Sequence, residues 1–164
     1  MIKSVSDFSF HPIAETVSPE IASEVIEIWT EFAGLDKAEA QRRLAELIMV
    51  VKDEAGKVVG VSTAVKTHLP QIQNYVFVYR CFILPKFRVP ALDTQMIVRS
   101  KNHLHQISKS ETEKKSVGIM VIVQNETLKK NWRQAVWRGA DMIYMGNTPK
   151  GDHMRIGYFK QARI

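Results

Sequence analysis

The sequence has a single cysteine, Cys81, and no apolar run long enough to cross a membrane. One cysteine cannot form an internal disulfide, which excludes the disulfide-rich secreted scaffolds. The longest apolar stretches, such as 75–79 and 118–123, are far shorter than the roughly 20 residues of a membrane-spanning helix. The first residues show no apolar run followed by small residues, so no signal peptide is predicted. We therefore expect a cytoplasmic protein without a membrane partner, with Cys81 buried on a strand beside Phe82 and Ile83.

Repeats, linkers and low-complexity tracts are also absent from the sequence. Apolar residues make up 45% of the chain and charged residues 24%, which are ordinary values for a globular protein. A length of 164 residues suits one hydrophobic core and leaves little room for a second. We therefore predict a single domain that spans residues 1–164.

Positive charge is scarce in the first half of the chain and plentiful in the second. Residues 1–84 carry 8 Lys and Arg against 11 Asp and Glu, a net charge of −3. Residues 85–164 carry 15 against 6, a net charge of +9. The second half is therefore the expected place for an anionic partner, such as a nucleotide-like cofactor, a nucleic acid or an acidic protein. A solvated basic surface explains the same charge equally well.

Two helices are predicted near the N-terminus. Ser18 can cap a helix that begins at Pro19, and apolar residues then recur at helical spacing up to Phe32. Asp36, with Glu39 three residues later, predicts the start of the second helix.

The rest of the chain alternates strands with helices. An entry strand or loose arm is expected within the first twelve residues, followed by strands at 48–52, 57–66, 74–84, 117–123, 141–145 and 154–159 and by helices at 91–107 and 126–138. A leading hairpin followed by a β-α-β-α-β order predicts antiparallel pairing first and parallel pairing later. The expected fold is an α/β (α+β) mixed sheet of about six to seven strands with helices on both faces.

The stretch after the long strand carries a resemblance to a known family. It reads Cys81-Phe-Ile-Leu-Pro-Lys-Phe-Arg-Val-Pro-Ala-Leu-Asp-Thr94. With the element order of residues 18–160, it resembles the GNAT superfamily of acyl-CoA-dependent N-acyltransferases, in which a V-x-P-like strand end leads through an Arg/Gln-x-x-Gly-x-Gly/Ala loop into a helix. Pro85 and Arg88 match that pattern, whereas Ala91 and Asp93 occupy its two glycine positions.

The resemblance implies a binding site for acetyl-CoA or another acyl-CoA. Helix N-termini bind phosphate groups through free N–H groups and the helix dipole. The implied cofactor-binding residues, from the strand end, the loop and the following helix, are Ile83, Leu84, Arg88, Val89, Ala91, Leu92 and Asn125. Pro90 lacks an N–H group, and Asp93 brings a negative charge to the place of the pyrophosphate. A solvated loop arginine is the alternative for Arg88.

Asn125 is assigned to this site because it follows the strand 117–123 and precedes a helix, as an asparagine does in the family. It can equally cap that helix, and the two roles are compatible. Family members often carry a tyrosine along this helix as the acid for the leaving thiolate. The stretch 126–138 has none, and Trp132 stands in that region.

Acyl transfer also needs groups that move protons, and two residues are the candidates. Tyr79, on the long strand, is the best candidate for the proton donor, with a core tyrosine as the alternative. Glu31, near the end of the first helix, is the candidate base, with a solvated helix face as the alternative.

Metal and thiol chemistry are not predicted. His103 and His105 are two residues apart on a helix, so they point in different directions, and no further ligands cluster with them. Cys81 has no basic partner that would activate it as a nucleophile.

Three functions fit the sequence. The first is transfer of an acyl group from acyl-CoA to an amine of a small molecule or a protein. The second is a GNAT-like domain without activity that binds or assembles, which would explain the lost glycines. The third is nucleic-acid binding, which is disfavoured because helix-turn-helix, zinc-finger and RNA-recognition signatures are absent. Homodimers are common in this fold, although the sequence locates no interface.

Overall fold

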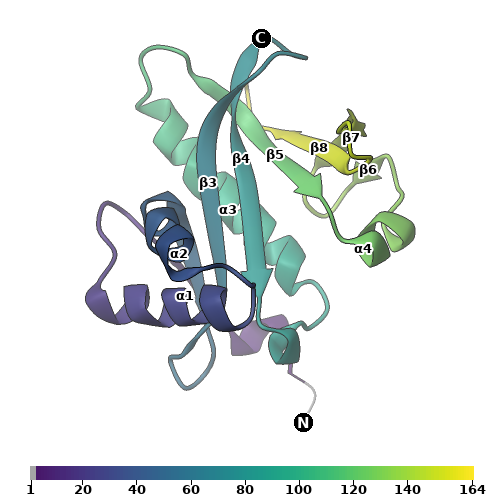
Figure 1. Ribbon diagram of the computed structural model, residues 1–164. Coiled ribbons are helices and arrows are strands. Elements are labelled where there is room, and N and C mark those ends of the chain that lie inside the picture. The colour runs from purple at the N-terminus through teal and green to yellow at the C-terminus, as the bar shows by residue number, and fades with distance from the viewer. Residues whose placement is uncertain (1–2) are drawn as a thin grey trace. The chain divides into compact units, whose positions relative to one another are not determined.

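A computed structural model describes residues 3–164 of the chain (Figure 1). Its helices are α1 (Pro19–Glu31), α2 (Lys37–Arg43), α3 (Leu92–Lys109) and α4 (Glu126–Asn131), with short 3-10 turns η1 (Val5–Asp7), η2 (Leu44–Glu46) and η3 (Pro85–Phe87). Its strands are β1 (Ser9–Pro12), β2 (Leu47–Lys52), β3 (Val58–Leu69), β4 (Asn74–Ile83), β5 (Ser116–Val123), β6 (Val136–Trp137), β7 (Met142–Asn147) and β8 (His153–Tyr158).

The strands form one mixed sheet in the order β1-β2-β3-β4-β5-β8-β7-β6. The mixed α/β sheet is confirmed, but it has eight strands rather than six or seven, because β6 lies in a stretch that was predicted to be helical. Strands β4 and β5 pair in parallel, as expected. Strand β8 pairs antiparallel with both β5 and β7, so the prediction that parallel pairing continues after the second crossover is wrong.

The chain forms two compact units. The first contains residues up to 64 and Cys81–Ser100, and the second contains Val65–Arg80 and Lys101–Ile164. Strands β3 and β4 and helix α3 each contribute residues to both units.

In the first unit, helices cover both faces of the sheet (Figure 1). Val50 belongs to a buried cluster with Trp29 of α1 and Ala40 of α2. Its neighbour Val51 belongs to a second cluster, with Leu92 and Met96 of α3 and with Phe8, Val59, Ile83 and Phe87. Successive residues of a strand point to opposite faces, so consecutive valines serve both clusters. The prediction of helices on both faces is confirmed for this unit.

The N-terminal helices begin where their capping residues predict. Ser18 Oγ accepts a hydrogen bond from the Ile21 N–H at 3.3 Å, and Asp36 Oδ1 accepts one from the Glu39 N–H at 2.8 Å. Each bond satisfies a backbone donor that has no partner within its helix. Both predicted helix starts are confirmed.

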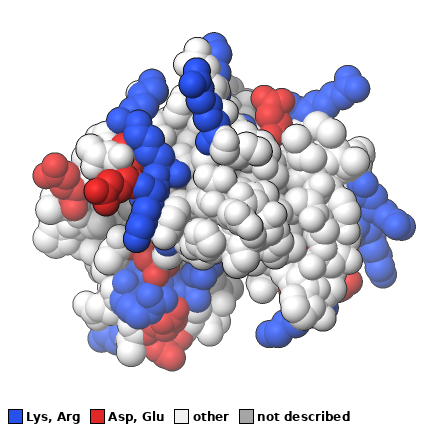
Figure 2. Space-filling model, turned by 90° about the horizontal axis from the view of Figure 1, so that it is seen from above, with Lys and Arg blue, Asp and Glu red and all other residues white. Residues whose placement is uncertain are grey.

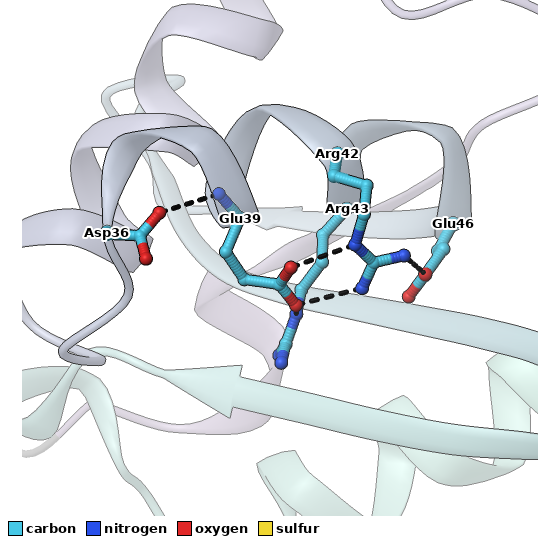
Figure 3. A network of polar contacts seen from close by, with 5 residues as sticks. All are labelled: Asp36, Glu39, Arg42, Arg43 and Glu46. Atoms are coloured by element: carbon cyan, nitrogen blue, oxygen red, sulfur yellow. Dashed lines mark hydrogen bonds and ion pairs between the residues drawn. The ribbon is translucent and has the colours of Figure 1, made fainter.

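A partly exposed ion-pair network runs along α2 (Figure 3). Glu39 accepts two hydrogen bonds from Arg42 at 2.8 Å and one from Arg43 at 2.6 Å, and Arg42 also binds Glu46 at 2.7 Å. The hydrogen bonds from Arg42, followed by that from Arg43, lower the pKa of Glu39 from 4.5 to about 2. Because the folded-state pKa is depressed, the network contributes stability above pH 4.5 and loses it as the pH falls towards 2.

The core of the second unit is built on β4, β5 and β8. Val76, Met120 and Ile156 are buried together with Leu69, Val117 and Met154. The His105 ring of α3 stacks on Phe159 at a centroid distance of 5.0 Å, and Phe77 contacts the same phenyl ring at 6.3 Å. None of the helices in residues 3–164 combines the length and apolar composition of a membrane span.

Helix α4 is shorter than the sequence predicts, because it ends at Asn131 instead of Arg138. Beyond it, Arg155 of β8 donates to the carbonyl oxygen of Trp132 at 2.9 Å and to that of Gln134 at 2.7 Å. Val136, which falls within the predicted helix 126–138, is instead exposed and pairs with Ile143 of β7. Carbonyl oxygens that bind an arginine are not available to a continuing helix.

Candidate functional site

The connection between β4 and α3, residues 84–91, holds most of the predicted site residues in the first unit. Arg88 is anchored here, because its Nε donates to the carbonyl oxygen of Ile83 at 3.0 Å and its guanidinium lies 5.7 Å from the Phe82 ring centroid. The side chain is exposed, and its two Nη groups have no hydrogen bond within residues 3–164. A fixed guanidinium with free donors suits an anionic ligand.

Val89-Pro90-Ala91-Leu92 forms a tight turn that leads into α3. The Leu92 N–H donates to the Val89 carbonyl at 3.3 Å, which closes the turn, and Ala91 has a φ of 66°. Proline at the second position and a positive φ at the third are typical of a type II turn, where glycine is the favoured third residue. Ala91 therefore adopts the left-handed conformation that a glycine would adopt at the same position.

Replacing Ala91 with glycine should stabilise the protein. A left-handed non-glycine residue costs roughly 1–2 kcal/mol, and the greater freedom of glycine in the unfolded chain offsets part of the gain. We expect Ala91→Gly to raise the free energy of unfolding by about 1 kcal/mol, measured by urea denaturation. Ala91→Val is the matched control and should lower it, because a branched side chain fits this conformation worse. A destabilised glycine variant would contradict the left-handed turn.

Most backbone donors of this segment already have partners. The Val89 N–H donates to the Phe87 carbonyl at 2.9 Å, and the Leu84 N–H donates to the Val59 carbonyl at 2.9 Å. The Leu92 N–H closes the turn described above. Within residues 3–164, the Ala91 N–H has no hydrogen-bond acceptor. The Ala91 N–H is therefore a backbone donor that a ligand can engage without breaking an existing bond.

Asp93 brings a carboxylate to the first turn of α3. Its Oδ1 accepts a hydrogen bond from the Thr94 N–H at 2.7 Å. An acidic group at a helix N-terminus interacts favourably with the helix dipole. The Asp93 carboxylate therefore already makes the favourable interaction with the N-terminus of α3 that an anionic ligand would make.

Two lysines add positive charge beside the connection. The Nζ atoms of Lys3 and Lys86 lie 4.8 and 4.9 Å from the ring centroid of Phe87, which is buried. A cation over an aromatic face is attracted by the ring. Lys3, Lys86 and Arg88 therefore bring three positive charges to this connection, beside the negative charge of Asp93.

A cavity of about 510 Å³ opens next to this segment, also within the first unit. It is lined by α1, the turn between β2 and β3, the start of β3 and the residues Leu84–Phe87. Glu31, the predicted base, is the last residue of α1 and is exposed, but it is not part of the lining. The acidic residues that line the cavity are Glu24, Glu27 and Asp53, none of which the sequence singled out.

The other two predicted site residues belong to the second unit. Tyr79 lies on β4, opposite Val121 of β5, and only 2% of its surface is exposed. Asn125 caps α4, because its Oδ1 accepts a hydrogen bond from the Leu128 N–H at 3.0 Å. The predicted capping role of Asn125 is confirmed, and its contact with a cofactor stays a prediction.

Within residues 3–164, no three His, Cys, Asp or Glu side chains lie close enough together to hold a metal ion. Cys81 is exposed, so the prediction that it is buried was wrong. It lies towards the end of β4, beyond the parallel pairing of Tyr75–Tyr79 with β5.

Charge is scattered over the surface that Figure 2 shows. Lys and Arg side chains appear at several separate places on that face, among Asp and Glu side chains and wide uncharged areas. Nucleic-acid-binding domains instead present a continuous basic patch or stripe. This face therefore gives no support to the nucleic-acid hypothesis.

No protein-family model matches the sequence, and no curated protein matches it. Solved structures do. A phosphinothricin acetyltransferase from Sinorhizobium meliloti, solved with acetyl-CoA, matches with a TM-score of 0.68 and 10% identity over 95% of this chain and 90% of its own. A GNAT-family acetyltransferase from Streptococcus pneumoniae matches with a TM-score of 0.66 and 9% identity over 93% and 99%.

A third similar structure is a ribosomal-protein-S5-alanine acetyltransferase from Vibrio fischeri, with a TM-score of 0.63 and 11% identity over 96% of both chains. Structural similarity at sequence identities this low supports a shared fold but not a shared substrate. The fold predicted from the element order is thereby confirmed. The chain has the fold of the GNAT superfamily of acetyltransferases.

Proposed function

We propose that this chain transfers an acetyl or other acyl group from acyl-CoA to an amine. The observation that carries the proposal is the turn at Ala91, which has the conformation of a glycine turn, presents a free N–H group and leads into an 18-residue helix. The anchored guanidinium of Arg88 lies in the same segment. Backbone N–H groups at a helix N-terminus with an arginine nearby suit a pyrophosphate.

In this proposal, Arg88 and the Ala91 N–H hold the diphosphate, and the Ile83–Leu84 backbone lies along the acyl arm. Val89, Leu92 and Asn125 stay in the proposed site, although the hydrogen bonds that they already make would have to coexist with the ligand or be exchanged. When bound, acyl-CoA supplies a thioester whose carbonyl carbon bonds to the amine nitrogen as the C–S bond breaks, while the proton lost by the amine ends on the thiolate sulfur. Glu31 is the proposed base that takes the proton from the amine, and Tyr79 is the proposed acid that gives a proton to the thiolate sulfur.

Removing the charge of Asp93 should strengthen acyl-CoA binding. A carboxylate near the diphosphate repels it, whereas asparagine can still accept the Thr94 N–H. We expect Asp93→Asn to lower the Kd for CoA about fivefold, measured by calorimetry at low salt. The control is Glu54→Gln, an exposed acidic residue of the β2–β3 turn, which should leave the Kd unchanged. Weaker binding by Asp93→Asn would show that the carboxylate supports the ligand.

Turnover is tested with acetyl-CoA and a panel of primary amines, by following free thiol and by mass spectrometry of the acetylated product. The proposal predicts thiol release that depends on the amine and is reduced in Glu31→Gln and Tyr79→Phe. Thiol release without an acetylated amine, or none with any acceptor, would contradict it.

An inactive GNAT-like domain that binds or assembles is the second candidate. Asp93 in the first turn of α3 and Trp132 in place of a helix tyrosine favour it. Acyl-CoA binding without turnover would support this candidate.

We also propose a cytoplasmic location, from the single cysteine, and a homodimer. Size-exclusion chromatography with light scattering tests the homodimer.

A further inference from the structure

The cavity of the first unit has the size of a small-molecule site. Its volume of about 510 Å³ falls in the usual range for ligand pockets, roughly 300–1,000 Å³. Ile28, Val58 and Leu84 form part of its apolar lining, and Phe32 stands at the end of α1 with 53% of its surface exposed. An exposed phenyl ring over an apolar lining provides a surface against which the apolar body of a ligand can pack.

Within residues 3–164, no lysine or arginine forms an ion pair with the carboxylates of the cavity. Glu24 Oε2 accepts the Val58 N–H at 2.9 Å, and Asp53 Oδ1 accepts the N–H groups of Ala55 and Lys57 at 3.0 Å. The Glu27 side chain makes no hydrogen bond and no ion pair within residues 3–164. Glu39, Glu111 and Asp152, by contrast, all lie in ion pairs with lysine or arginine.

Glu24 and Glu27 are three residues apart on α1, where side chains are neighbours. Like charges at this spacing repel, and a cation between them would turn that repulsion into attraction. The two lysines that line the cavity do not supply this cation. Lys86 directs its Nζ to the Phe87 ring at 4.9 Å, and Lys57 lies exposed on the β2–β3 turn without an ion pair within residues 3–164.

We propose that this cavity binds a primary amine with an apolar body. The ammonium group lies at Glu27, next to Glu24, and the body packs against Phe32, Ile28 and Leu84. This step rests on the proposed function: the bound amine is the acyl acceptor. The cavity shares Leu84–Phe87 with the segment that leads to Arg88, so the amine would lie beside the proposed acyl-CoA site. An apolar amine is thereby selected over apolar acids.

Calorimetry with three probes of one shape tests the proposal without any acyl-CoA present. The probes are 2-phenylethylamine, the neutral 2-phenylethanol and the anionic 3-phenylpropionate. The amine should bind at least about tenfold more tightly than either of the others. Glu27→Gln should weaken the amine about tenfold and leave the alcohol unchanged, whereas Phe32→Ala should weaken both. Both side chains are exposed, so the variants should fold, which circular dichroism checks.

Glu54→Gln is the matched control. Glu54 is an exposed acidic residue of the β2–β3 turn, next to Asp53, but it does not line the cavity. It should leave amine affinity unchanged. Equal binding of acid and amine, no binding of the amine, or an unchanged affinity in Glu27→Gln would overturn the inference, whether or not the protein binds acyl-CoA. Amine binding that depends on Glu27 but is never followed by acetylation would support the amine site and contradict its role as the acceptor site of the proposed enzyme.

Discussion

Gly118→Ala is expected to lower the free energy of unfolding by about 3 kcal/mol. Gly118 pairs with Tyr158 across β5 and β8. A Cβ atom on Gly118 would overlap with the carbonyl oxygen of Gly157 and would lie 2.9 Å from the Cα of Tyr158. Both neighbours are backbone atoms, so the two strands would have to separate. A fall of the melting midpoint by roughly 6–12 °C should accompany the change.

Gly60→Ala is the matched control on β3. The nearest atoms to a Cβ on Gly60 are the Met96 Sδ and the Val51 Cβ, both at 3.4 Å, and the Ile83 Cγ1 at 3.5 Å. These distances are close to ordinary contacts with side chains that can adjust, so the expected loss is below about 1 kcal/mol. Equal losses in the two variants would show that the β5–β8 contact is looser than the structure indicates.

Arg155→Met is expected to cost a similar amount, about 3 kcal/mol. Only 1% of the Arg155 surface is exposed, and burial lowers its pKa. Its guanidinium lies 4.0 Å from the Trp137 ring centroid and binds the carbonyl oxygens of Trp132 and Gln134. Methionine fills similar space but removes the hydrogen bonds to both carbonyl oxygens and the cation–π contact, whereas the Trp132 oxygen keeps its bond from the Trp137 indole N–H at 3.2 Å.

Urea denaturation measures this loss, and hydrogen exchange of residues 132–137 locates it. The segment should exchange faster in Arg155→Met, because the side chain that holds its carbonyl groups is gone. Arg155→Lys keeps the charge but cannot bind two carbonyls with a planar group, so it should recover only part of the stability. Full stability of Arg155→Met would mean that the segment is held by its other contacts alone.

Local signals were enough to predict the first helices and the strand that follows them. The side chains of Ser18 and Asp36 act on donors three residues away, so their effect is written in the adjacent sequence. The strand predicted at 48–52 is present as β2, and its consecutive valines Val50 and Val51 lie in separate buried clusters, as is typical of a strand buried on both faces.

Interactions between distant residues explain what the sequence analysis missed. Trp132 and Val136 follow a helical pattern, yet Arg155, more than twenty positions away, binds the carbonyl groups that would continue the helix. The insertion of β8 between β5 and β7 likewise depends on pairings that no local pattern encodes. Cys81 has apolar neighbours in sequence but is exposed.

The candidate site was predicted in part. Pro85 and Arg88 were recognisable as a motif, whereas the left-handed turn at Ala91 was not, because alanine gives no sign of a positive φ. The cavity was missed because its carboxylates come from α1 and from the β2–β3 turn, about 26 residues apart along the chain. Their positions in the sequence give no sign that Glu27 and Asp53 line the same cavity.

Binding of acetyl-CoA to the β4–α3 connection is measured most directly by isothermal titration calorimetry of the wild-type chain beside Arg88→Glu. Lys150→Glu, a charge reversal on an exposed turn, is the control for net charge. We expect one equivalent of acetyl-CoA to bind the wild type and Lys150→Glu alike, and Arg88→Glu to bind at least about tenfold more weakly. No binding of acetyl-CoA or CoA to the wild type at about 1 mM, or equal binding by Arg88→Glu, would contradict an acyl-CoA site at this connection.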